Sequence, residues 1–75
     1  MSDEEKLLAK EACEAMDLYN VILAAGHADA ENYGIEARKK LDALREEMGE
    51  PVYFANRNGR IAIINSHRIF YQHVG

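Results

Sequence analysis

The cysteine and histidine side chains of this sequence, the ligands that a structural zinc ion prefers, are Cys13, His27, His67 and His73. A structural zinc site usually takes its ligands in closely spaced pairs, and no two of these four residues have that spacing. Cys13 lies near the apolar face of an expected helix, which favours a buried thiol over a reactive one. The sequence therefore predicts no metal site and no bound cofactor.

The serine and threonine content offers no catalytic arrangement either. Ser2 and Ser66 are the only serines, threonine is absent, and residues 51–75 contain no carboxylate that could orient His67. The five glycines are scattered along the chain, whereas a phosphate-binding loop needs them clustered at a helix start. We therefore expect no catalytic residues and a protein that is not an enzyme.

One group of residues has the side chains needed to bind a partner, because it places arginines beside aromatic rings. On a strand face, such a group can contact phosphates and stack on bases. A solvated hairpin end, whose arginines keep the strand edge from aggregating, explains the same residues. The expected partner-binding residues are Arg57, Arg60, His73, Tyr71, Tyr53, Ile64 and Ile69.

The charged residues are divided unevenly along the chain, whose net charge is −4. Residues 1–50 hold all 13 acidic residues and six of the nine basic ones, a net charge of −7. Residues 51–75 hold three arginines and no acidic residue, a net charge of +3. The carboxylates repel nucleic acid over longer distances, which disfavours general DNA binding.

With 75 residues, 48% apolar and 29% charged, the chain has the size and composition of one soluble domain, residues 1–75. A single cysteine excludes an internal disulfide, so association between copies is the remaining way to stabilise so small a core. The sequence has no signal-peptide pattern and no run of about 18 apolar residues. These features predict a cytoplasmic protein without a membrane partner.

The acidic half, residues 1–50, has the pattern of a helical hairpin. Ser2 and Glu5 have the spacing of a capping box, and apolar residues then recur at three- and four-residue steps as far as Gly26. Residues 18–25 are apolar almost all round the helix, which places them either in the domain core or in a subunit interface. The expected interface of a homodimer consists of Leu18, Val21, Ile22 and Ala25.

A second helix is expected over residues 29–48, followed by the terminating residues Gly49 and Pro51. Gly34 weakens its first turns by about 1 kcal/mol relative to alanine, so a start near Asn32 or Tyr33 is the alternative. Opposite charges four residues apart support this helix, in the pairs Glu36 with Lys40 and Arg38 with Asp42.

The basic half, residues 51–75, has the pattern of a β-meander. Asn58 and Gly59 between two β-prone runs form a strong hairpin signal, because both central residues of a type I′ turn need positive φ. This turn places Arg57 opposite Arg60, Phe54 opposite Ile63 and Ala55 opposite Ala62. A second loop at Ser66 and His67 would place Ile64 opposite Ile69, Ile63 opposite Phe70, Ala62 opposite Tyr71 and Arg60 opposite His73. Alternatively, Ser66 caps a short helix over residues 67–73.

These registers predict an α+β fold, in which a helical hairpin packs on a three-stranded antiparallel β-meander. The sheet face that carries Phe54, Ile63 and Phe70 is expected to face the helices. We expect a small non-enzymatic interaction protein that binds and modulates, most simply by inhibiting, another macromolecule, as short phage- or plasmid-encoded inhibitors do. The alternative is an RNA- or nucleotide-binding module that uses the basic aromatic sheet face.

Overall fold

Helix α1 (Asp3–Ala24) begins at the capping box predicted from its sequence. In the computed structural model, which describes residues 1–74, Ser2 Oγ accepts a hydrogen bond from the Glu5 backbone N–H at 3.1 Å. In return, Glu5 Oε1 accepts a hydrogen bond from the Ser2 N–H at 2.7 Å. This bond to the Ser2 backbone lowers the pKa of the Glu5 carboxyl, and the reciprocal pair satisfies two backbone donors at the helix start.

Helix α2 (Ala30–Met48) begins with Ala30 and not at the alternative starts further along. Gly34 lies inside the helix and is buried, because the ring of Tyr19 on α1 packs directly over it. A Cβ atom at position 34 would lie only 3.0 Å from Tyr19 Cε1. Glycine therefore weakens the helix locally but permits a close approach of α1 and α2, and Gly49 at φ 72° ends α2 as predicted.

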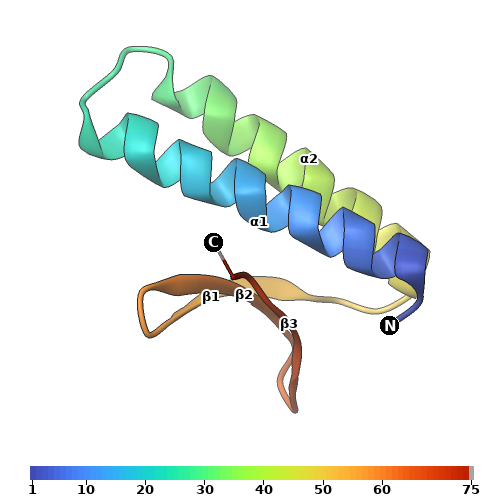
Figure 1. Ribbon diagram of the computed structural model, residues 1–75. Coiled ribbons are helices and arrows are strands. Elements are labelled where there is room, and N and C mark those ends of the chain that lie inside the picture. Colours follow the sequence, from blue (N-terminus) through green and yellow to red (C-terminus); the bar gives the residue numbers. More distant parts are fainter. Residues whose placement is uncertain (75) are drawn as a thin grey trace.

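The basic half forms three strands, β1 (Tyr53–Arg57), β2 (Arg60–Ile64) and β3 (Ile69–Gln72), in the antiparallel order β1-β2-β3 (Figure 1). Asn58 at φ 57° and Gly59 at φ 78° form the turn between β1 and β2. The pairing runs from Tyr53 opposite Ile64 to Arg57 opposite Arg60, which confirms the predicted register. The third segment is a strand and not the alternative helix.

The predicted register between β2 and β3 is correct only at its first pair, Ile64 with Ile69. A β-bulge follows, so Ile63 pairs with Tyr71 instead of Phe70. The displaced register continues to the end of the strand, where the His73 N–H donates to the Ile61 carbonyl oxygen at 2.9 Å. Because a shift of one residue moves a side chain to the other sheet face, the predicted facing of Tyr71 and His73 is wrong.

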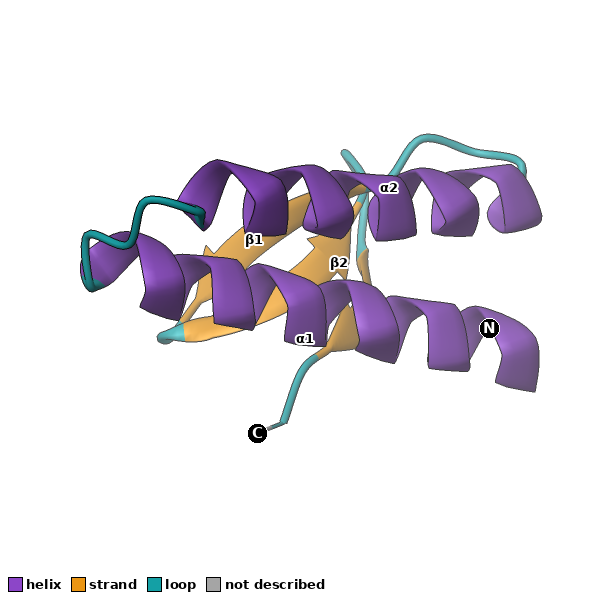
Figure 2. Ribbon diagram, turned by 90° about the horizontal axis from the view of Figure 1, so that it is seen from above, coloured by secondary structure: helices purple, strands orange, loops and turns teal. Residues whose placement is uncertain are grey.

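The two helices lie side by side across one face of the sheet (Figures 1 and 2). Ile63 is fully buried in the core between these layers, and Phe54 packs against that core, which confirms the predicted inner face of β1 and β2. The buried core cluster comprises Ala9, Cys13, Leu41, Leu44, Val52, Ile61 and Ile63. Neither helix in residues 1–74 has the length and apolar character needed to cross a membrane.

Candidate interaction surface

The sheet face turned away from the helices carries a row of apolar side chains at adjacent positions of the three strands. Tyr53 of β1 pairs with Ile64 of β2, which pairs with Ile69 of β3. Tyr53 is 50% exposed, Ile69 is 41% exposed, and Ile64 is half-buried. No element of residues 1–74 covers this face, as Figure 1 shows. Three of the predicted partner-binding residues therefore lie together in an accessible row.

Arg57 and Arg60 lie on the same sheet face, at the end of the β1–β2 hairpin, and are direct cross-strand partners. Both are exposed and, with Asn58 and Gln72, line an open cavity of about 390 Å³. Within residues 1–74 neither guanidinium forms an ion pair with a carboxylate. Like charges placed directly opposite each other destabilise a strand pair. The chain thus retains an electrostatic cost that an anionic group from outside would remove.

His73 and Tyr71 do not join the arginines, although the sequence predicted one surface for all four. His73 is 9% exposed, and its Nε2 atom lies 3.2 Å from Asp17 Oδ2 on α1. Its Nδ1 atom is buried and has no hydrogen-bond partner among the described residues. Tyr71 packs against the core, where burial raises the pKa of its hydroxyl and the negative charge of Glu14 adds to the increase. Both residues tie β3 to α1.

Arg45 of α2 contacts the edge of the apolar row, a contact that sequence reasoning missed. Its Nε–H donates to the Val52 carbonyl oxygen at 2.9 Å, and its guanidinium carbon lies 5.4 Å from the centre of the Tyr53 ring. Its Nη1 atom is also 2.8 Å from Asp42 Oδ1, so Asp42 pairs with Arg45 instead of Arg38. The sequence contains no signal for the contact of Arg45 with Val52 and Tyr53, because that contact depends on where the chain passes from α2 into β1.

Cys13 has the environment of a structural thiol. Its side chain is fully buried, and burial, with the negative potential of Asp17 and Glu14, raises its pKa to about 12. A thiol with this pKa stays protonated at neutral pH and is a poor nucleophile and metal ligand. Among residues 1–74, no three His, Cys, Asp or Glu side chains converge as metal ligands would.

The residues predicted as a homodimer interface lie on the outer side of α1. Leu18 is 47% and Val21 is 64% exposed, Ala25 is exposed, and Ile22 is half-buried. The chain therefore does not cover this stripe fully with its own core, and self-association through it stays a prediction.

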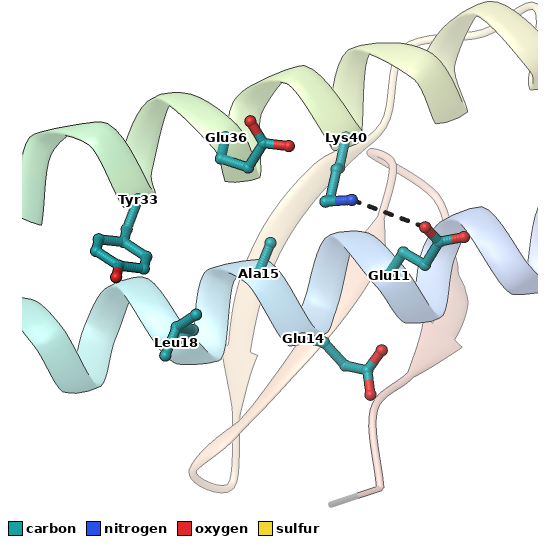
Figure 3. A pocket seen from close by; sticks show the side chains of 7 residues that line it. All are labelled: Glu11, Glu14, Ala15, Leu18, Tyr33, Glu36 and Lys40. Carbon is teal, nitrogen blue, oxygen red and sulfur yellow. Dashed lines mark ion pairs between the residues drawn. The ribbon is translucent and has the colours of Figure 1, made fainter.

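A groove between the two helices adjoins this stripe (Figure 3). Its lining residues are Glu11, Glu14, Ala15 and Leu18 from α1 and Tyr33, Glu36 and Lys40 from α2. Lys40 pairs with Glu11 across the groove at 3.7 Å, whereas the sequence predicted Glu36 as its partner. The apolar periodicity of each helix predicted the face that packs in the core, but it gave no signal for a groove between the helices on their outward side.

Comparison with protein-family models, with curated proteins and with solved structures finds no match to this chain. The function is therefore inferred from the residues and their geometry.

Proposed function

We propose that this protein is a small non-enzymatic interaction module that binds another protein through its outer sheet surface. This surface consists of Tyr53, Ile64, Ile69, Arg57 and Arg60. The observation that carries the proposal is the opposed arginine pair, which has no carboxylate partner within residues 1–74. The pair lies on the same sheet face as an uncovered apolar row, from which the pair Ala55 and Ala62 separates it. Binding would bury that row and bring an anionic group to the arginines.

The two parts of the outer sheet surface have different roles in such a complex. Tyr53 and Ile69 provide apolar area of which about half is exposed in the free chain, and burial of such area drives association. Arg57 and Arg60 provide forked donors that recognise carboxylate or phosphate groups in a fixed orientation. A partner that presents an acidic side chain beside an apolar patch satisfies both parts. By covering such a patch, the module would inhibit whatever the partner does with it.

The observed orientation of Tyr71 and His73, which point towards the helices, favours a protein partner over RNA. A single-stranded RNA platform stacks successive bases on exposed rings. Of the three rings that the sequence placed on this face, Tyr71 and His73 instead pack towards the helices, and Tyr53 alone is exposed. The net charge of −4 also opposes the approach of a polyanion.

The direct test compares two charge reversals, Arg60→Glu on the outer sheet surface and Arg38→Glu on α2. Both arginines are exposed, so Arg38→Glu should change the free energy of unfolding by no more than about 0.5 kcal/mol. Arg60→Glu places opposite charges across from each other and should not lower it. Each tagged variant and the wild-type protein would be used for affinity capture from the source cell, with and without nuclease. We expect Arg60→Glu to lose the partner and Arg38→Glu to retain it.

Two outcomes contradict this proposal. An Arg60→Glu protein that captures its partner as efficiently as the wild type removes the arginine pair from the binding site. Loss of all captured material after nuclease treatment would identify a nucleic-acid partner instead of a protein.

A further inference from the structure

The groove between α1 and α2, hereafter the helical groove, lies on the opposite side of the molecule from the outer sheet surface. Figure 3 shows its side chains in front of the two helices and the strands behind them. The groove has a volume of about 430 Å³. No part of residues 1–74 forms a third layer over it, as Figure 1 shows. Both surfaces of the protein can therefore be occupied at the same time.

The helical groove combines apolar side chains with an excess of negative charge. Ala15 and Tyr33 are half-buried, and Leu18 is 47% exposed. Of its four charged residues, Lys40 is already paired with Glu11. Glu14 and Glu36, one on each helix, are exposed and form no ion pair within residues 1–74. The groove thus has two uncompensated carboxylates, one from each helix.

We propose that the helical groove binds a basic amphipathic helix of a partner protein. A helix that lies along a groove between two helices inserts apolar anchors three or four residues apart, here towards Leu18 and Tyr33. Lysine or arginine residues beside those anchors would then approach Glu14 and Glu36. The charge complementarity identifies the occupant, because an acidic or neutral helix would leave both carboxylates unpaired.

The same charges argue against a second copy of this chain as the occupant. Two copies that met through their helical grooves would bring together two surfaces of the same sign, because each groove has three glutamates and one lysine. Like charges in a partly desolvated interface disfavour association. The homodimer predicted from Leu18 and Val21 thus becomes the competing outcome of the test.

The probe for this site is a synthetic helical peptide of about 18 residues, or five turns, built from leucine and lysine in an amphipathic pattern. A leucine and glutamate peptide with the same pattern is its control. Each peptide would be titrated into the isotope-labelled protein and followed by NMR. We expect the lysine peptide to shift the amide signals of Ala15, Leu18 and Tyr33 in a saturable manner and the glutamate peptide to shift none of them.

Two leucines on α1 supply a matched pair of variants. Leu18 lines the helical groove at 47% exposure, whereas Leu23 has a similar exposure of 53% and does not line it. We expect Leu18→Asn to weaken binding of the lysine peptide about tenfold, as truncation of an apolar anchor does, and Leu23→Asn to leave it unchanged. Thermal unfolding of both variants checks that each is folded.

The carboxylates are tested by a double variant in which Glu14 and Glu36 are replaced by Gln. Its control is the double variant in which Glu46 and Glu47 are replaced by Gln, because these residues lie outside the groove and their replacement changes the net charge by the same amount. Only the first should weaken binding and flatten its salt dependence. Equal effects of the two double variants, or of the two leucine variants, would reduce the binding to general charge attraction and overturn the proposal. A self-association that Leu18→Asn abolishes in sedimentation would identify a second copy as the occupant and overturn it too. Neither result bears on capture through Arg60.

Discussion

The β1–β2 hairpin and the β2–β3 hairpin share strand β2 but are closed in different ways. Asn58 and Gly59 close the first with two consecutive positive φ angles, and the register then follows without a break. The second is closed by a longer loop in which Asn65 Oδ1 accepts hydrogen bonds from the N–H groups of His67, at 2.8 Å, and Arg68, at 2.9 Å. A bulge interrupts its register. A turn whose two residues both need positive φ determines pairing locally, whereas a loop with no positive φ leaves pairing to packing against the core.

The largest effect should come from Ile63, which belongs to both hairpins and is fully buried. We expect Ile63→Ala to lower the free energy of unfolding by about 2 to 5 kcal/mol, from lost transfer energy and the cavity left behind. This is a large share of the about 4 to 11 kcal/mol expected for a domain of this size. Urea denaturation measures it, with Ile69→Ala as control, since Ile69 is 41% exposed on the outer face. Equal losses in the two variants would show that the inner and outer faces are misassigned.

The first turn should respond mainly to its backbone angles. Gly59 has φ 78° and would leave an added Cβ in open space, so Gly59→Ala introduces backbone strain without a clash. We expect a loss of about 1 to 2 kcal/mol, the cost of a left-handed conformation for an L-residue. Thermal or urea unfolding is the measurement. A neutral result would mean that the turn does not need its positive φ and that the register is maintained by other contacts.

The second loop should respond to a side chain instead. Asn65→Ala removes the acceptor of two backbone N–H groups and should cost about 1 kcal/mol, because both donors are exposed and can turn to water. The neighbouring Ser66→Ala is the control and should stay within about 0.5 kcal/mol of the wild type. If both substitutions have the same small effect, the two loops do not differ in the way described above.

The smallest effect concerns the contact that joins β3 to α1. Asp17→Asn removes the charge that faces His73 Nε2 at 3.2 Å, and we expect a loss below about 1 kcal/mol because Asp17 is 42% exposed. Glu14→Gln, on the same helix and outside any ion pair of residues 1–74, should have no effect on unfolding. A larger loss from Glu14→Gln than from Asp17→Asn would contradict the inward position of His73.

Several features could be predicted from the sequence because each depends on a few neighbouring residues. The capping box of Ser2 and Glu5, the glycine that ends α2 and the type I′ turn at Asn58 and Gly59 are all of this kind. Together with the helical and strand periodicities, they determined the order of the elements, the inner face of β1 and β2 and the accessible row on the outer face.

Other features were decided only in the tertiary structure, because they depend on residues far apart in the chain. The bulge in β3 turns Tyr71 and His73 towards α1, where Asp17 and the core receive them, and no local pattern encodes that choice. Gly34, which as a single residue only weakens a helix, is explained by the Tyr19 ring packed over it. The helical groove likewise exists only once two distant helices lie side by side. Local stereochemistry acts through the backbone of a few residues. The orientation of side chains relative to the core, the close approach of two helices and the shape of the surface follow from how complete elements pack.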